Sequence, residues 1–198
     1  MTKVLESPHY PEQWELDPVL SDGAIARVRP IRPDDAGALV EFHEGLSLET
    51  VHMRFFGLHP HLSEAEVMRF TNVDYCDRMA FVGELSGRIV AVGRYDRLPR
   101  TDEAEVAFVV TDAQQGRGLG SLLLEYLAAR ARECGITRFV ADTLYSNRRM
   151  LSVFRRAGFA EREAVEHDVV RVVLDIEPTG RTIVANLRDG GFRGPRAG

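Results

Sequence analysis

The 198-residue sequence lacks the features that mark secreted, membrane-spanning or nucleic-acid-binding proteins. No apolar run approaches the roughly 18 residues of a membrane-spanning helix, and the start of the chain has no apolar signal segment. The net charge is only −5, so no overall basic field exists that could hold nucleic acid or an anionic membrane. We therefore expect a soluble, cytoplasmic protein that binds neither nucleic acid nor membranes.

Cysteine is also scarce, with only Cys76 and Cys134 in the chain. Two thiols in an intracellular-looking sequence predict free cysteines rather than a disulfide. The four histidines between residues 43 and 61 do not follow the spacing of a zinc site, and no second ligand pair lies near them. We expect these histidines to lie on the surface or in a substrate groove, and we expect no metal.

What is present is ordinary globular composition, with 44% apolar and 28% charged residues, which favours one domain. Residues 1–176 are interpreted as that domain, and residues 1–24, which contain three prolines, as its extended lead-in. Residues 177–198 differ, since seven of them are Gly or Pro and four arginines against two acids give a charge of +2. This segment is predicted to be a flexible tail.

Hydrophobic periodicity predicts an α/β fold. A strand–helix–strand crossover within an otherwise antiparallel set implies a mixed, mostly antiparallel sheet with helices on both faces. The expected strands are 26–31, 79–85, 88–95, 103–111, 138–144 and 169–176, and the expected helices begin near residues 33, 48, 63, 119 and 147.

A glycine-rich turn is the most informative segment. Gly116, Gly118 and Gly120 lie between an expected strand and an expected amphipathic helix. Glycines let the backbone approach a ligand closely, and the first N–H groups of a helix favour a phosphate or pyrophosphate. A Walker loop is excluded because no lysine follows, and the dinucleotide fingerprint fails because Ser121 or Leu123 occupies the position of its third glycine.

The pattern that remains, Gln115-x-x-Gly118-x-Gly120, resembles the pyrophosphate loop of the GNAT N-acetyltransferase superfamily. The strand EVAFVV before it and the segment RAGF ending at residue 159 follow in the family's order, so the resemblance covers about residues 25–176. The lead-in YPEQWELDPVLSDG and the segments VRPIRPDDA and SLETVHMRFF resemble, more narrowly, bacterial Pat-type protein lysine acetyltransferases.

The resemblance implies a GNAT fold in which acetyl-CoA lies where strand 103–111 splays from strand 138–144. Asn147 and Arg156 match positions near the pantetheine and phosphate ends, although Asn147 could be a plain helix N-cap and Arg156 a solvated cation. The pantetheine would pair with the backbone of Phe108, Val109 and Val110, and the pyrophosphate would meet the N–H groups of Gln115, Gly116, Arg117, Gly118, Leu119 and Gly120.

Acetyl transfer to an amine requires that the ammonium first lose a proton, for which a nearby carboxylate can serve as base. Glu105 matches the family's usual base position, although it could be an exposed strand charge. Glu103 shares its strand face but lies nearer the strand's start, where we expect it to be solvated. Phe154 occupies the position of a tyrosine that could protonate the leaving thiolate in many family members, so we assign no general acid.

These features predict an acetyl-CoA-dependent N-acetyltransferase that modifies exposed protein lysines, for example of acyl-CoA synthetase-type enzymes. One alternative is a small-molecule amine acetyltransferase on the same fold, and another is a non-catalytic acyl-CoA-binding module. A groove open at both sides would favour a protein acceptor, whereas a closed acidic pocket would favour a polyamine or an aminoglycoside. The sequence assigns no oligomeric state.

Overall fold

The computed structural model describes residues 9–177. The first eight residues and all but the first residue of the expected flexible tail lie outside the described part. Within that part, no helix is both long and apolar enough to cross a membrane.

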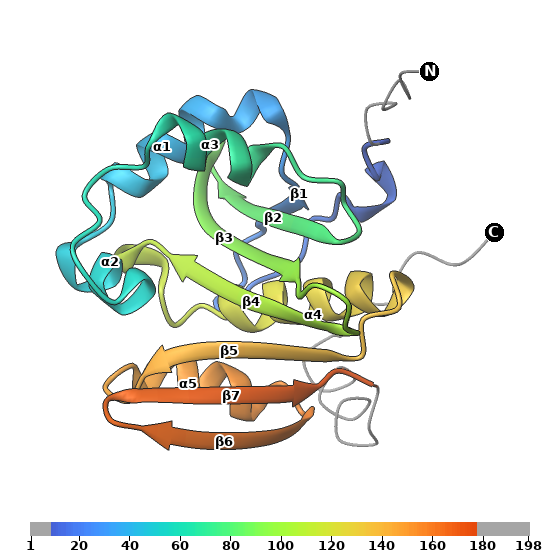
Figure 1. The fold of residues 1–198 in the computed structure, drawn as a ribbon. Coiled ribbons are helices and arrows are strands. Elements are labelled where there is room, and N and C mark those ends of the chain that lie inside the picture. The colour runs from blue at the N-terminus through green and yellow to red at the C-terminus, as the bar shows by residue number, and fades with distance from the viewer. Residues whose placement is uncertain (1–8, 178–198) are drawn as a thin grey trace.

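One seven-stranded sheet forms the centre of the molecule (Figure 1). Its strands are β1 (Arg27–Pro30), β2 (Arg78–Leu85), β3 (Arg88–Arg97), β4 (Glu103–Val110), β5 (Arg138–Leu144), β6 (Ala160–Glu166) and β7 (Val169–Asp175). They lie in the order β1-β2-β3-β4-β5-β7-β6, and every neighbouring pair is antiparallel except β4 and β5. The expected mixed, mostly antiparallel sheet is confirmed.

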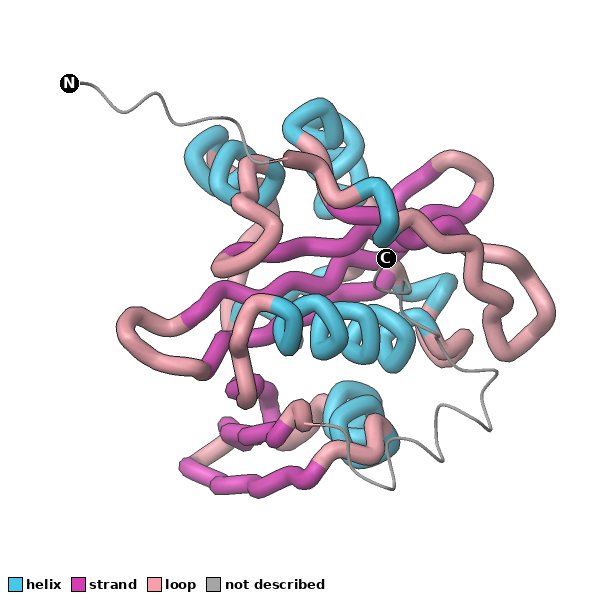
Figure 2. The backbone as a smooth tube through the Cα atoms, turned by 90° about the vertical axis from the view of Figure 1, so that its right-hand side faces the viewer, coloured by secondary structure: helices cyan, strands magenta, loops and turns pink. Residues whose placement is uncertain are grey.

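Helices cover both faces of the sheet, as expected (Figures 1 and 2). One face carries α1 (Ala36–Glu44), α2 (Leu48–Phe55) and α3 (Glu64–Thr71), and the other carries α4 (Leu119–Glu133) and α5 (Arg148–Arg156). The capping box that the sequence predicted at Ser63 is formed with Glu66.

Close packing of α4 against the sheet depends on a residue without a side chain. A Cβ on Gly93 of β3 would lie 2.9 Å from the Phe108 ring and 3.1 Å from Cβ of Leu123. Such contacts are too short for a relaxed core, so glycine lets the helix approach β3 and β4 directly. This close packing fixes the position of β4, the strand that contains Glu105.

The described part of the lead-in belongs to the folded core. Trp14 lies in a short 3-10 turn and is only 1% exposed, packed against Phe81. The backbone of Leu16 bridges to Val28 of β1. Residues 9–24 thus combine a short 3-10 turn with isolated backbone bridges, and they contribute Trp14 and Leu20 to the hydrophobic core.

One strand was not predicted from the sequence. Residues 160–166, which form β6, read AEREAVE and have neither alternating apolar residues nor turn signals that would mark a strand. β6 is an edge strand that pairs only with β7, and its residues 163–166 are exposed. Edge strands need no buried face, and charged residues there protect against pairing with other chains.

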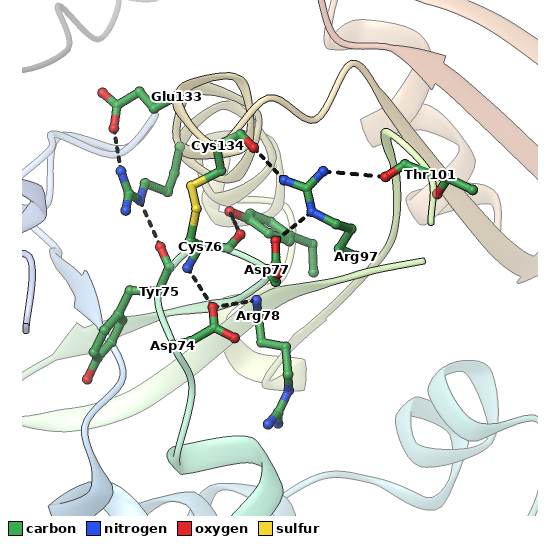
Figure 3. The surroundings of a disulfide bond; sticks show 11 residues. Asp74, Tyr75, Cys76, Asp77, Arg78, Arg97, Thr101, Glu133 and Cys134 are labelled. Carbon is green, nitrogen blue, oxygen red and sulfur yellow. Dashed lines mark hydrogen bonds and ion pairs between the residues drawn. A yellow bond between two sulfur atoms is a disulfide. The ribbon is translucent and has the colours of Figure 1, made fainter. Parts of the chain in front are cut away.

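The expectation of free cysteines is wrong in this structure, because Cys76 and Cys134 form a disulfide (Figure 3). Their Cα atoms are 5.5 Å apart, within the normal range for a bridge. The loop before β2 is held against the end of α4 by Arg130, whose Nε donates to the Tyr75 carbonyl over 2.9 Å. Tyr95 adds a hydrogen bond of 2.8 Å to the carbonyl of Cys76. These tertiary contacts bring together two thiols that are 58 residues apart in sequence.

Candidate active site

Strands β4 and β5 separate part-way along their length (Figure 1). They pair at three positions, the last being Glu105 with Val140. Beyond it, β4 stays paired with β3 as far as Val110, and β5 stays paired with β7 as far as Leu144. Each strand is therefore held by its outer neighbour, and the expected splayed pair is confirmed. We call the gap between residues 106–110 and 141–144 the fork, and its unpaired edges can accept a strand-like ligand.

Glu105 lies at the closed end of the fork. Its side chain is exposed, whereas Ala104 and Val106 on either side point into the core. Within residues 9–177, no hydrogen bond or ion pair engages the Glu105 carboxylate. Glu103, on the same strand face, instead forms an ion pair of 3.2 Å with Nε of Arg138. Glu105 is thus the β4 carboxylate that is left without a hydrogen bond or ion pair among the described residues, and its role as base stays a prediction.

The glycine-rich loop lies at the open end of the fork and begins α4. Gly116 and Gly118 have φ values of +81° and +91°, which side chains with a Cβ rarely adopt. Nothing lies within 4 Å of the positions where their Cβ atoms would be. Gly118 is also the N-cap of α4 and offers no side-chain acceptor, so the first N–H groups of the helix are not capped. This geometry suits a pyrophosphate.

Two loop residues whose backbone N–H groups were assigned to the pyrophosphate have side chains that are engaged with the protein. Nε2 of Gln115 donates to the carbonyl of Val110 over 3.1 Å and to Thr50 over 3.2 Å. Arg117 pairs with Asp22 of the lead-in over 2.7 Å. These side chains brace the loop. The Gln115 N–H already donates to the carbonyl of Asp112 over 3.4 Å, so of these two residues only Arg117 is expected to offer its backbone N–H to a ligand.

Among the other predicted cofactor residues, some have buried side chains and one packs against α5. Phe108 and Leu119 are buried, so they can offer only backbone atoms to a ligand, as Val109 also does in our prediction. Gly120 supports helix packing, since a Cβ there would lie 3.4 Å from a methyl group of Val153 on α5. Gly116 and Gly118 thus leave open space at the loop, whereas Gly120 lets α4 pack against α5.

Asn147 is the N-cap of α5, and its side chain accepts a hydrogen bond of 3.1 Å from the N–H of Met150. This is the plainer of the two roles that the sequence left open. Arg156, at the other end of α5, is exposed and has no hydrogen bond or ion pair with the described residues. Cofactor contacts by either residue stay predictions.

No tyrosine stands in for the missing general acid. Phe154 is 2% exposed and packs against Phe108, with ring centroids 6.3 Å apart. Tyr145 is exposed and lies under the Arg148 guanidinium, 4.3 Å from ring centroid to Cζ. Tyr126 is buried beneath the sheet, and this burial raises the pKa of its phenol. The thiolate is therefore expected to leave unassisted or to take a proton from water.

Helix α2 is anchored to the segment that precedes the glycine loop. Asp112 accepts hydrogen bonds from the Ser47 N–H over 3.1 Å, from the Ser47 hydroxyl over 2.7 Å and from the Thr50 hydroxyl over 2.8 Å. Burial alone would raise the pKa of Asp112, but these hydrogen bonds outweigh it and hold that pKa below its ordinary value. No local sequence pattern marks this anchor, because it joins residues more than sixty positions apart.

Two further arginines near Glu105 were also missed. Arg54 of α2 and Arg94 of β3 line a pocket between the first three helices and the sheet face that carries Glu105. Arg54 lies within the segment SLETVHMRFF, but nothing in that segment or around Arg94 predicts their juxtaposition, which depends on the cross-strand register and on where α2 docks. Among the described residues, no group of three or more potential ligands could hold a metal ion.

The chain matches the model of the Acetyltransferase (GNAT) family over residues 46–159. The chain belongs to the GNAT family. It is 47% identical to the solved GNAT domain of Pat from S. lividans, with a TM-score of 0.80 over 84% of this chain and 99% of that one. It is also 32% identical, over 71% of its length and 77% of the relative's, to Acetyltransferase PA5475 of Pseudomonas aeruginosa. We conclude that it is an acetyl-CoA-dependent N-acetyltransferase.

A further relative is larger than this chain. Acetyltransferase Pat of Mycolicibacterium smegmatis is 33% identical over 76% of this chain, but the match spans only 46% of that protein. The chain thus spans about half of this relative. A GNAT-fold structure solved with acetyl-CoA, yncA from Salmonella typhimurium, is 19% identical with a TM-score of 0.63 over 79% of this chain and 97% of that one, which shows a shared fold.

Acetyl-CoA fits what the GNAT site of this chain offers. The unpaired strand edges of the fork can pair with the pantetheine amides, and the uncapped start of α4 can bind the pyrophosphate. The bound thioester supplies the activated acetyl group. The chain itself binds and orients it.

Replacing Gly118 with valine should weaken CoA binding at least tenfold, which corresponds to about 1.4 kcal/mol. Valine is strained at a φ of +91°, and its methyl groups would occupy the open space that a phosphate needs. The affinity is measured by calorimetry. Gly87→Val is a matched control, since Gly87 has a φ of +73° and open space around it but lies in the β2–β3 turn. Equal affinities for the two variants would remove the loop from the site.

Proposed function

We propose that this GNAT enzyme transfers the acetyl group of acetyl-CoA to the ε-amino group of lysines in proteins, for example acyl-CoA synthetase-type enzymes, with Glu105 as general base. The observation that carries the proposal is the 47% identity to the GNAT domain of S. lividans Pat over 99% of that domain. The resemblance of the lead-in and of residues 47–56 to Pat-type enzymes supports it. The proposed cellular location is the cytoplasm.

The proposed reaction is a direct attack. A lysine is almost entirely protonated at pH 7, and freeing its lone pair costs about 4 kcal/mol. The Glu105 carboxylate takes this proton, directly or through a water molecule. The amine nitrogen then forms a bond to the acetyl carbon while the carbon–sulfur bond breaks, and CoA leaves as a thiolate that takes a proton from solvent.

The location of Glu105 supports this role. It is the last β4 residue that pairs with β5, so its carboxylate lies where a thioester at the closed end of the fork would meet an incoming amine. Family membership favours an enzyme over a non-catalytic acyl-CoA-binding module. The pocket beside Glu105 contains two arginines, and this disfavours a polyamine or an aminoglycoside as acceptor.

The proposal is tested with isotopically labelled acetyl-CoA and a dialysed lysate, from which small amines have been removed. Modified residues are then located by mass spectrometry. We expect the label on lysine ε-amino groups, and we expect the initial rate of labelling to fall by about 10²–10⁴ when the chain carries Glu105→Gln. The proposed acceptor is wrong if dialysed proteins remain unlabelled while added small amines are acetylated.

A further inference from the structure

The sheet face that carries Glu105 also carries several arginines. Residues that pair directly across neighbouring strands point to the same side of a sheet, and Arg78, Asp96 and Glu105 are paired in one row across β2, β3 and β4. Arg94 lies two residues before Asp96 on β3 and points the same way, with its Cζ 4.1 Å from the centroid of the Phe70 ring on α3. An acceptor must approach Glu105 from this side, because α4 covers the other face of β4 (Figures 1 and 2).

Helices α2 and α3 add two more arginines to this side of the sheet. Arg54 of α2 interacts electrostatically with both Arg94 and Glu105, which places its guanidinium group close to them. Arg69 of α3 forms an ion pair of 3.4 Å with Asp96. We use the name arginine cluster for the side chains of Arg54, Arg69, Arg78 and Arg94.

The arginine cluster has more positive charge than its surroundings balance. The carboxylates that act on Arg54 and Arg94 are those of Asp96 and Glu105. Asp96 is shared among three arginines, at 3.1, 3.4 and 3.9 Å, and within residues 9–177 Arg54 forms no ion pair. Four cations and two carboxylates leave a net charge of +2 on this surface, although the whole chain has a charge of −5.

The arginines also repel one another. Burial, together with repulsion from Arg94, lowers the pKa of Arg54 to about 10, so this side chain still has its charge at neutral pH. Burial lowers the pKa of Arg94 as well, and repulsion from Arg69 and Arg78 adds to this effect against the attraction of Asp96. Partly buried cations that repel one another are stabilised by an anion that binds among them. The arginine cluster therefore favours a partner with a negative charge.

The distance between Glu105 and Arg94 matches a spacing in extended polypeptide. The two residues are diagonal neighbours across β3 and β4, which places them about 7–8 Å apart. In an extended segment, side chains two residues apart lie on the same side and are separated by about 6.6 Å, whereas adjacent side chains point to opposite sides. An acceptor segment with its lysine at Glu105 can therefore present the side chain two residues away to Arg94.

We propose that the arginine cluster selects lysines that have an aspartate or glutamate two residues away in the acceptor protein, with Arg54 and Arg94 binding that carboxylate. This inference rests on the proposed function, because it presumes a lysine acceptor, and it leaves the transfer step unchanged. Arginine and carboxylate form strong, charge-assisted hydrogen bonds. A lysine without an acidic neighbour brings a further cation to a positive surface, and this repulsion discriminates against it.

The test uses short peptides of alanine and glycine with blocked ends and one central lysine. The kcat/KM for acetylation should be at least about tenfold higher with aspartate than with asparagine at the second position before or after the lysine. Aspartate directly beside the lysine should change kcat/KM by less than about threefold, because that side chain points away from the cluster. Equal values for aspartate and asparagine at both second positions, or an equally large preference at the adjacent positions, would overturn the proposal.

Variants show whether the arginines cause this preference. In Arg54→Met and in Arg94→Met, the aspartate-to-asparagine ratio should fall below about threefold. Arg69→Met should lower the ratio about twofold without disturbing the fold, since the Arg69 side chain is 60% exposed. Arg88→Met is the matched control and should keep the full ratio, because Arg88 is exposed at the other end of β3. Thermal melting shows that each variant is folded, and a ratio that survives in all the folded variants of the cluster would overturn the proposal.

The inference and the proposed function fail in different ways. In the dialysed lysate, the labelled lysines should have acidic residues two positions away more often than the unlabelled lysines of the same proteins, and Arg94→Met should abolish this excess. Labelled lysines without such an excess would overturn the inference alone. If small amines are acetylated while neither peptides nor lysate proteins are, the proposed function is wrong and the inference falls with it.

Discussion

Replacing Glu105 with glutamine should lower the rate of acetyl transfer by about 10²–10⁴ at neutral pH. Glutamine preserves the size of the side chain at the closed end of the fork but cannot accept a proton from the ammonium. The affinity for CoA should hardly change, since the loop and the strand edges that bind it remain. Single-turnover measurements give the rate of the chemical step, and calorimetry gives the affinity.

The control for this prediction is Glu103→Gln. Glu103 lies on the same face of β4, but its carboxylate is paired with Arg138, so its loss should have little effect on the rate. The defect in Glu105→Gln should also shrink as pH rises toward the pKa of the acceptor amine, because more free amine then exists without a base. If Glu105→Gln retains most of its activity when chemistry limits the rate, the assignment is wrong, and Glu103 or a chain of waters is the next candidate.

The parts of the fold that could be predicted from the sequence have strong local patterns. The amphipathic repeat that starts at Leu119 predicted α4, and the run of β-branched and apolar residues before the loop predicted β4. Strand β6 was missed because it buries no continuous apolar face and is fixed by its pairing with β7. The disulfide was missed because the contact between Cys76 and Cys134 depends on the docking of a loop against the end of α4.

In the candidate site too, residues with a local sequence pattern could be predicted, and residues placed by tertiary contacts could not. The loop glycines have a spacing that resembles the GNAT pyrophosphate loop. That resemblance also led to the prediction that Glu105 is the general base. The sequence predicted no side-chain direction for the loop, because that direction depends on tertiary contacts; Gln115 turns toward Thr50 and Arg117 toward Asp22. The pocket with Arg54 was not visible in the sequence, because its walls come from helices α1, α2 and α3, from strands β2, β3 and β4 and from Ile31 and Leu62, which only the tertiary structure brings together.

Removing the disulfide should produce the largest change in stability. A bridge between Cys76 and Cys134 closes a loop of 58 residues, which by chain entropy stabilises the folded state by about 4 kcal/mol. The double variant Cys76→Ser, Cys134→Ser should therefore lose about 4 kcal/mol in the free energy of unfolding, and its melting temperature should fall by roughly 8–16 °C. Urea titration measures the first quantity and calorimetric melting the second.

A reductant provides the control for this prediction, since it should destabilise the unaltered chain by a similar amount and leave the double serine variant unchanged. CoA affinity should be nearly the same in both forms. The bridge is at the C-terminal end of α4, whereas the glycine loop is at its N-terminal end, and 15 helical residues span about 22 Å. A double variant as stable as the unaltered chain would show that the contacts of Arg130 and Tyr95 hold the loop without the bridge. A large loss of CoA affinity in a folded variant would instead show that the bridge positions α4 for cofactor binding.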